Sequence, residues 1–363
     1  MRDKPISIDP ALRRAGRGAV SNATGRFEAH ERAFEADGWD IEEESRPLRT
    51  EVSPERPRKM ITYNRSPDLP FDRSINPYRG CEHGCIYCFA RPTHAWLGLS
   101  AGLDFETRLI ARPEAPQVLA KELRKTSYRV APIAIGTNTD PYQPIEKTHE
   151  IMRACLQVLS DFNHPVAIVT KGSLIERDID ILSDMAARGL AKVGITVTTL
   201  NADISRKLEP RAPAPKRRLR IISRLAEAGI PVRIMTSPII PGLTCHEIEP
   251  LLAAGAKAGA TAATWVMLRL PLEVSPLFRE WLAEHVPHRA KRVMGLVRAM
   301  HGGKDYAGDW GRRMRGQGAY AEVIAQRFKL ASKRLGLDQE MSDLRCDLFA
   351  PPTAPGDQLS LFE

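Results

Sequence analysis

The sequence has no long hydrophobic run. Although 43% of the 363 residues are hydrophobic, no stretch approaches the roughly 18 consecutive apolar residues that a membrane-spanning helix needs. The opening residues, Met1-Arg2-Asp3-Lys4-Pro5, precede no apolar segment of the kind found in secretory signals. These absences predict a cytoplasmic protein without a membrane span.

Cysteine is also scarce, and six residues are few for a disulfide scaffold. Cys81, Cys85 and Cys88 lie close together, whereas Cys155 and the two remaining cysteines stand alone. In a reducing compartment such a group indicates metal ligands and not disulfides. No second cysteine-rich segment is present, so we expect a single metal centre.

The charge balance is basic, with 53 Lys and Arg against 44 Asp and Glu and a net charge of +9. The excess gathers at residues 56–59, 216–220 and 312–315. Such patches favour polyanionic partners, nucleic acid above all, although basic runs also occur as solvated faces without a ligand. Charge alone therefore leaves the partner open.

Short apolar runs alternate with helical stretches between residues 60 and 272. Strands are predicted near 74–78, 133–136, 166–170, 193–197, 232–235 and 263–267, with helices near 115–125, 144–160, 175–188, 214–228 and 245–258. This alternation is typical of a parallel sheet with right-handed crossovers. About six repeats are too few for a closed eight-stranded barrel, so we predict an α/β fold with a partial (β/α)6 TIM-like barrel.

Three further segments flank this core. Residues 1–55 are polar and aperiodic, which predicts a flexible N-terminal arm. Residues 273–345 contain helical patterns at 275–300 and 319–335, which predict a C-terminal helical extension. Residues 346–363 form a Pro-rich tail that ends in a short peptide motif.

The cysteine segment carries the clearest chemistry. It reads Gly80-Cys81-Glu82-His83-Gly84-Cys85-Ile86-Tyr87-Cys88. Cysteine thiolates are the usual ligands of iron–sulfur clusters, and three ligands for a four-iron cluster leave one iron open. Two alternatives remain at this point: a zinc ion completed by His83 or His94, and a buried group of apolar cysteines.

The Cys-x3-Cys-x2-Cys spacing, with an aromatic residue before the last cysteine, resembles the radical S-adenosylmethionine (radical SAM) superfamily. The resemblance implies a [4Fe–4S] cluster whose open iron binds S-adenosylmethionine, and reductive cleavage of that cofactor to a 5′-deoxyadenosyl radical. It also implies an external electron donor of the flavodoxin or ferredoxin type.

Across residues 74–270 the pattern resembles the spore photoproduct lyase-like branch, whose founding member repairs a thymine lesion in DNA. The matching segments lie mostly where strands end: 136–142, 170–172, 196–198, 209–213 and 236–242. The resemblance implies that the cofactor is contacted by Tyr87, Asp140, Lys171, Thr196, Thr198, Arg211 and Ser237. Lys171 or Arg211 would meet the methionine carboxylate, and Tyr87 would lie beside the adenine.

One departure from the branch concerns the hydrogen donor. The lyase has a cysteine three residues before the matching Asp-Pro, whereas this chain has Thr137. A threonine hydroxyl does not readily donate a hydrogen atom, so the same repair reaction is not implied. Tyr142 and Cys245 are weak substitutes as catalytic residues, and Cys155 is expected in the core.

Two features point to DNA-associated partners. Residues 358–362 resemble the peptide that binds the DNA polymerase sliding clamp in bacterial repair proteins, through Gln358, Leu359, Leu361 and Phe362. The alternative is a tail that packs on its own core. Basic residues near the last helix are candidates for contact with nucleic-acid phosphates: Arg312, Arg313, Arg315, Arg327, Lys329, Lys333 and Arg334.

These observations favour a radical SAM enzyme, lyase-like in its resemblance, that acts on DNA or another nucleic acid in a repair-like reaction. The alternatives are a radical SAM enzyme acting on RNA or a small molecule, and a non-catalytic iron–sulfur redox sensor that binds DNA. A clamp-tethered zinc protein is a further possibility, which metal analysis would distinguish.

Overall fold

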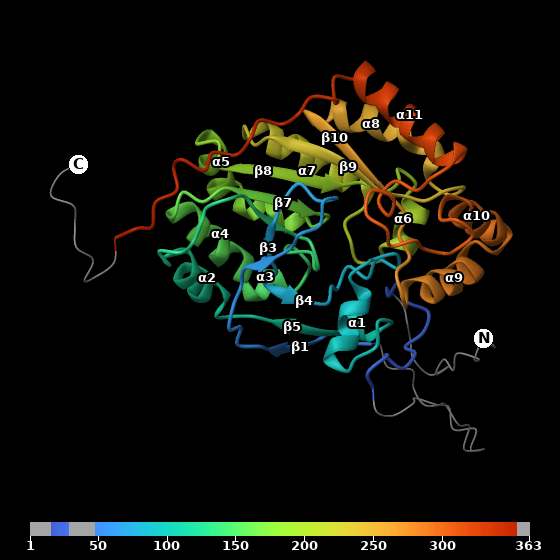
Figure 1. Cartoon of the computed structure of the whole chain (residues 1–363), viewed down its shortest axis with the longest axis horizontal. Helices are drawn as coiled ribbons and strands as arrows, with labels where there is room; N and C mark the ends of the chain where they lie inside the picture. Colours follow the sequence, from blue (N-terminus) through green and yellow to red (C-terminus); the bar gives the residue numbers. More distant parts are fainter. Residues whose placement is uncertain (1–15, 29–47, 354–363) are drawn as a thin grey trace.

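The computed structural model describes residues 16–28 and 48–353. Its main sheet has the strand order β10-β9-β8-β7-β6-β3-β2 (Figure 1). Six parallel strands follow one another in chain order: β3 (Arg73–Ile75), β6 (Ile133–Ile135), β7 (Val166–Thr170), β8 (Ala191–Thr196), β9 (Val232–Ile239) and β10 (Ala262–Met267). The antiparallel β2 (Thr62–Tyr63) adds to the β3 edge. The predicted α/β fold with a partial (β/α)6 barrel is therefore confirmed.

Helices between the strands cover the outside of the sheet. They are α2 (Ala115–Leu123), α4 (Ile151–Asp161), α5 (Ile179–Ala187), α7 (Pro215–Glu227) and α8 (Ile248–Lys257). The short α3 (Glu146–His149) precedes α4, and α6 (Ala202–Leu208) lies beyond the end of β8, near α9 and α10 (Figure 1). Alternate strand residues such as Val193 and Ile195 are buried in the main hydrophobic core, which also contains the apolar faces of α4, α7 and α8. The opposite strand face is left for the barrel interior.

The single helix expected at 144–160 is divided at Glu150, which has a φ of 51°. The carboxylate of Glu146 accepts hydrogen bonds from the amides of Met152 at 3.0 Å and Arg153 at 3.2 Å. These bonds satisfy donors in the first turn of α4, so that a new helix begins there.

A second, three-stranded sheet was not predicted from the sequence. Its order is β1 (Glu51–Pro54), β5 (Arg108–Ala111) and β4 (Tyr78–Arg79). The helical turns α1 (Asp104–Thr107) and η1 (Arg91–Leu97) lie beside it in sequence. Because β1 pairs with β5, the end of the expected flexible arm is part of the fold. Residues 17–21 are buried as well, which corrects the prediction for the described parts of the arm.

The C-terminal helices are α9 (Val274–His285), α10 (Pro287–Met300) and α11 (Ala319–Arg334). The helix expected at 275–300 is two helices because Pro287 begins α10. Beyond α11 the chain runs along the outside of the molecule (Figure 1), where the Phe349 ring lies 5.7 Å from Tyr128 and 5.5 Å from His164 between centroids. Leu348 and Phe349 of the predicted tail thus pack on the core.

The open side of the barrel, between β10 and β2, is crossed by the connection between α10 and α11. The amide of Met267, at the end of β10, donates to the carbonyl of Met314 at 2.9 Å. The neighbouring Arg313 donates to Asp68, between β2 and β3, at 2.7 Å. The connection therefore joins the two edges of the sheet.

No helix in the described part of the chain is long and apolar enough to cross a membrane.

Candidate active site

The three clustered cysteines lie on a loop between β4 and η1. Cys81 and Cys85 are buried and Cys88 is half-buried. Gly80 and Gly84 have φ values of 74° and 66°, a backbone conformation that favours glycine. A Cβ atom added to Gly84 would lie 2.6 Å from a carboxylate oxygen of Glu106. The loop therefore depends on glycine for its curvature.

The environment of the thiols suits an iron–sulfur cluster. Burial raises the pKa of Cys85 to about 12 and raises the pKa of Cys81 well above its ordinary value. The thiolates therefore need strong positive charge beside them, which bound iron supplies. Cys81, Cys85 and Cys88 would hold such a cluster.

The zinc alternative finds no support in the neighbouring histidines. His94 Nε2 lies 2.9 Å from the carbonyl of Arg108, and His83 Nδ1 lies 3.3 Å from a carboxylate oxygen of Asp140. Within residues 16–28 and 48–353, no three His, Cys, Asp or Glu side chains converge to hold a single metal ion. The described residues therefore provide no preformed zinc site that includes either histidine.

A buried ion pair supports the cysteine loop from behind. The fully buried guanidinium of Arg91 donates to the carbonyls of Gly84 at 3.1 Å and Cys85 at 2.9 Å, and to Glu106 at 2.5 Å. Glu106 is itself fully buried. Sequence analysis missed both residues because an isolated Arg and an isolated Glu carry no motif.

The N-terminal segment closes this arrangement. The amides of Gly18 and Ala19 each donate to the Glu106 carboxylate at 2.8 Å. Arg17 donates to the carbonyl of Glu106 at 2.9 Å. Gly18 and Ala19 therefore share the carboxylate that holds Arg91, and Gly18 lies against Gly84 of the loop that carries the cysteines.

Glu209 is the centre of a buried polar network at the carboxyl end of the sheet. Its carboxylate accepts hydrogen bonds from Tyr87 Oη, from Thr198 Oγ1 at 2.8 Å and from the fully buried Arg218. Burial opposes its charge, but Arg218 and Lys171 outweigh this effect and lower the pKa of Glu209 to about 2. Glu209 lies in a segment that resembles the family, yet its role was not predicted.

Lys171 completes the network. Its Nζ lies 4.0 Å from a Glu209 oxygen and 5.8 Å from the centroid of the Tyr87 ring. Burial alone would lower the pKa of Lys171, but the proximity of Cys85 and Glu209 raises it. Lys171 therefore remains a cation close to the cysteine loop, as a carboxylate-binding residue requires.

Asp140 joins the ends of two strands. Its carboxylate accepts hydrogen bonds from Thr170 Oγ1 at 2.5 Å, the Lys171 amide at 2.9 Å and the Tyr142 amide at 2.9 Å. Despite burial, interaction with His83 and these donors lowers the pKa of Asp140 to about 2. Asp140, which was predicted to contact the cofactor, thus holds the backbone of Lys171 in place instead.

Of the remaining residues predicted to contact the cofactor, some already form hydrogen bonds within the protein and one does not. Arg211 donates to Glu82 at 2.7 Å, and the Thr196 carbonyl accepts from Arg218 at 3.2 Å. By contrast, Ser237 Oγ is buried and has no hydrogen-bond partner in the described structure. A buried hydroxyl of this kind calls for a polar group from elsewhere, which fits a bound cofactor.

Apolar side chains of the C-terminal helices cover the cysteine loop. Cys85, Ile86 and Tyr87 belong to one hydrophobic cluster with Phe278 and Trp281 of α9. Trp281 Nε1 donates to the carbonyl of Lys207 at 2.9 Å. This cover limits access of water to the loop, as radical chemistry requires.

The two weak catalytic candidates lie elsewhere. Tyr142 is part of the main hydrophobic core, and burial raises its pKa well above the ordinary value. The sulfur of Cys245 lies 3.1 Å from the hydroxyl of Tyr320 at the start of α11. Neither residue belongs to the hydrophobic cluster around Cys85.

The predicted nucleic-acid contacts fall into two groups. Arg313 is paired with Asp68, Arg327 with Glu249, and Arg315 lies over the Trp265 ring at 4.2 Å, so these cations have intramolecular partners that the sequence pattern did not indicate. Arg315 is nevertheless exposed, as are Arg312, Lys329, Lys333 and Arg334. The terminal peptide with Gln358, Leu359, Leu361 and Phe362 lies outside the described residues.

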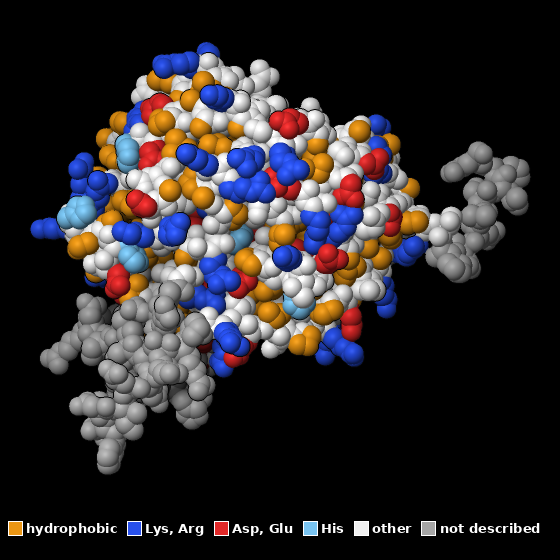
Figure 2. Space-filling view, turned by 180° about the vertical axis from the view of Figure 1, so that it is seen from behind, with side chains coloured by type: hydrophobic (Ala, Val, Ile, Leu, Met, Phe, Trp, Pro, Cys, Tyr) orange, Lys and Arg blue, Asp and Glu red, His pale blue; other side chains and the backbone are white. Residues whose placement is uncertain are grey.

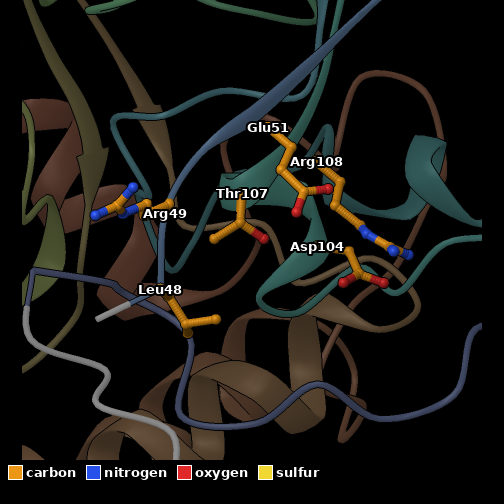
Figure 3. A pocket seen from close by; sticks show the side chains of 6 residues that line it. All are labelled: Leu48, Arg49, Glu51, Asp104, Thr107 and Arg108. Atoms are coloured by element: carbon orange, nitrogen blue, oxygen red, sulfur yellow. The ribbon is translucent and has the colours of Figure 1, made fainter. Parts of the chain in front are cut away.

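Two surface features bear on the location of the site. Seen from behind, Lys and Arg side chains form several groups separated by acidic and hydrophobic side chains, and not one continuous basic face (Figure 2). A cavity of about 440 Å³ lies beside the small sheet and α1 (Figure 3). It is lined by Leu48, Arg49, Glu51, Asp104, Thr107 and Arg108, none of which belongs to the Glu209 network.

Comparison with known proteins places this site in a family. The family model for the radical SAM superfamily matches residues 75–254. An uncharacterized protein of Mycobacterium tuberculosis is 36% identical over 232 residues, which cover 63% of this chain and 68% of the relative. An uncharacterized protein of Methanocaldococcus jannaschii is 28% identical over 169 residues, which cover 47% of this chain and 61% of that protein.

Solved structures show the same fold. Spore photoproduct lyase complexed with dinucleoside spore photoproduct aligns with a TM-score of 0.57 at 15% identity, over 78% of each chain. A mutant of that lyase with bound AdoMet and dinucleoside spore photoproduct aligns with a TM-score of 0.54 at 14% identity, again over 78% of each chain. The chain therefore belongs to the radical SAM superfamily and is a radical SAM enzyme, a class that uses a [4Fe–4S] cluster and S-adenosylmethionine.

Proposed function

We propose that this enzyme acts on a nucleic acid, in a repair-like reaction on a damaged or modified base of DNA. The observation that carries the proposal is the fold, which aligns over 78% of the chain with a lyase complexed with a dinucleoside lesion. The net charge of +9 and the exposed cations of α11 also favour an anionic polymer as substrate.

The chain's own residues prepare the site. Cys81, Cys85 and Cys88 would hold the cluster, and Lys171 and Ser237 are available to contact the cofactor. When bound, the cluster and S-adenosylmethionine together supply a carbon-centred radical that abstracts hydrogen from substrate. The apolar cover from α9 would exclude water around it.

The proposed reaction differs from that of the lyase in how hydrogen returns to the product. At the position of the lyase's hydrogen-donating cysteine, Thr137 Oγ1 lies 3.4 Å from Asn76 Oδ1. Asn76 Oδ1 also accepts a hydrogen bond from the Asn138 amide at 3.0 Å. Thr137 has no thiol, and its hydroxyl is hydrogen-bonded to Asn76. We therefore propose a lyase-like enzyme whose product does not acquire hydrogen from this residue.

The first experiment is anaerobic reconstitution followed by electron paramagnetic resonance with and without S-adenosylmethionine. The expected result is a reduced [4Fe–4S] signal that changes with the cofactor and is absent from Cys85→Ala. Formation of 5′-deoxyadenosine is then measured with damaged DNA, RNA and no nucleic acid. Turnover unaffected by any nucleic acid would reject the proposed substrate class and favour a small molecule. A cluster indifferent to S-adenosylmethionine would favour a redox sensor.

Two protein partners belong to the proposal. A flavodoxin or a ferredoxin-like protein would supply the electron, and residues 358–362 would bind the sliding clamp of a DNA polymerase. Pull-down of purified clamp by wild type but not by Leu361→Ala/Phe362→Ala would support the second partner, and equal recovery would reject it.

A further inference from the structure

An exposed aromatic ring stands next to the last cluster cysteine. Phe89 follows Cys88 directly, and 44% of its surface is exposed. The guanidinium carbon of Arg269 lies 4.2 Å from the centroid of the Phe89 ring. Arg269 follows the end of β10 by two residues, so the pair brings the cysteine loop and the last strand together at the carboxyl edge of the barrel.

The charge of Arg269 is not compensated by an acidic side chain. This half-buried residue forms no ion pair with the residues that the structure describes. Asp68 attracts Arg269 only at longer range, and its carboxylate already accepts hydrogen bonds from Arg313 and from the Gly311 amide. Burial lowers the pKa of Arg269, partly opposed by Tyr306. An arginine without an ion-pair partner can accept a phosphate as its counter-charge.

We propose that Phe89 and Arg269 form a docking site for one nucleotide of a single-stranded or extruded nucleic-acid segment. The base stacks on the Phe89 ring and the adjacent phosphate binds the Arg269 guanidinium. Base stacking on aromatic rings and phosphate contact by arginine are the two elements that bind single strands without sequence preference. The proposal rests on the proposed function, for which it names the site of substrate entry.

The position of the pair suits this role. The connection between α10 and α11, which carries Arg313, crosses the open side of the barrel. The exposed Trp310 also belongs to this connection. Phe89 follows the cluster ligand Cys88 directly, and its ring lies 4.2 Å from the guanidinium carbon of Arg269. A nucleotide held by Phe89 and Arg269 therefore lies beside the loop at which the radical would form. A base must leave a duplex stack to reach such a site.

The test measures binding of fluorescent single-stranded DNA of about 12 nucleotides to reconstituted protein by anisotropy. We expect Arg269→Gln to weaken binding about 10-fold at about 0.1 M salt, and to reduce the dependence of log K on log salt by about one unit. Phe89→Leu, which retains an apolar side chain without the ring, should weaken binding about 10-fold. Arg129→Gln is the matched control and should bind like wild type, because this exposed arginine precedes β6, at the edge of the sheet opposite Phe89 and Arg269.

A second measurement needs no variant. DNA that carries 4-thiothymidine is cross-linked by light to the wild-type holoenzyme, and the modified peptides are identified by mass spectrometry. Cross-links to the peptides containing Phe89 or Arg269 support the site. Cross-links confined to α11, or wild-type affinity in both Arg269→Gln and Phe89→Leu, would overturn it.

These outcomes separate the inference from the proposed function. If DNA stimulates 5′-deoxyadenosine formation while both variants bind normally, the docking site alone is rejected. If binding depends on both residues but no nucleic acid is processed, the docking site stands and the proposed reaction is rejected.

Discussion

Asp68 binds the connection between α10 and α11 across the open side of the barrel. One carboxylate oxygen accepts from the Gly311 amide at 2.6 Å, and the other accepts from Arg313 Nε at 2.7 Å. Asp68 belongs to the segment between β2 and β3, whereas the connection pairs with β10 through Met267. A partial barrel has two edge strands whose backbone groups could pair with another chain. The connection between α10 and α11 covers these edges.

Replacement of Asp68 should release this contact. We expect Asp68→Ala to accelerate amide hydrogen exchange in residues 64–72 and 309–315, because the carboxylate holds both segments. Asp347→Ala removes an acid paired only with Arg345, two residues away, and should leave both segments unchanged. Hydrogen exchange with mass spectrometry distinguishes the two variants. Equal exchange in Asp68→Ala and wild type would show that the connection is held by other contacts.

The cysteines divide into ligands and structural residues. Cys81→Ala, Cys85→Ala or Cys88→Ala should each reduce bound iron and abolish 5′-deoxyadenosine formation, because each removes one of three thiolate ligands. Cys155→Ala should retain the cluster, since this thiol is buried in the main core. Iron and sulfide analysis after anaerobic reconstitution tests both statements. Cluster loss in Cys155→Ala without unfolding would contradict the assignment.

Cys245 provides a separate test. Its sulfur contacts Tyr320 and accepts from the Gly242 amide at 3.2 Å. Cys245→Ser should therefore preserve both the cluster and the turnover rate within about twofold, because a hydroxyl conserves the hydrogen bonds. A large loss of turnover with a normal cluster would restore Cys245 as a hydrogen donor.

The parallel strands were predictable because their apolar runs are flanked by turn residues and separated by helices of ordinary length. β1, β4 and β5 were not, because their local signals are weak. β1 is mostly exposed and ends in a proline, and β4 has only two residues, so neither shows the apolar run that would have identified it as a partner of β5. The N-terminal segment illustrates the same limit. Residues 17–21 look polar and aperiodic, yet Arg17 and the amides of Gly18 and Ala19 are bound by Glu106, about 90 positions later.

For the site, the sequence identified the residues that belong to a motif, and the supporting charges remained hidden. The spacing of Cys81, Cys85 and Cys88 indicated a cluster by itself. Glu209 and Arg218 instead form an ion pair with each other, and this pairing depends on how α7 packs against β8. Arg313 shows the converse error, because a basic run predicts an open phosphate contact until the fold provides Asp68 as its partner.

The packing of residues 16–22 against the cysteine loop can be tested at Gly18. A Cβ atom on this residue would lie 1.9 Å from the carbonyl oxygen of Gly84. Gly18→Ala should therefore displace the segment, and we expect the reconstituted cluster to be lost faster in air than in wild type. Gly295→Ala, at a helical position with open space, should be neutral or stabilising by about 0.5–1 kcal/mol. Decay of the cluster absorbance provides the measurement, and equal rates in Gly18→Ala and wild type would show that the segment can move without consequence.

Glu209 offers the sharpest test of the buried network. Glu209→Gln leaves the buried cations Arg218 and Lys171 without their counter-charge, and the expected loss in free energy of unfolding is about 3–5 kcal/mol at pH 7. Glu249→Gln is the matched control, because Glu249 and its partner Arg327 are both substantially exposed. Its cost should be below about 1 kcal/mol.

The pH dependence of the same variant gives an independent check. The pKa of Glu209 is lowered from 4.5 to about 2 in the folded protein, so its carboxylate stabilises the fold fully above pH 4.5. That contribution declines as the pH falls from 4.5 towards 2, because in this range the unfolded state binds a proton at Glu209 and the folded state does not. Wild type should therefore lose stability more steeply than Glu209→Gln between pH 5 and pH 2, by about 3 kcal/mol in total. Urea unfolding followed by circular dichroism measures the difference, and parallel pH profiles would show that Glu209 is not held as a buried anion.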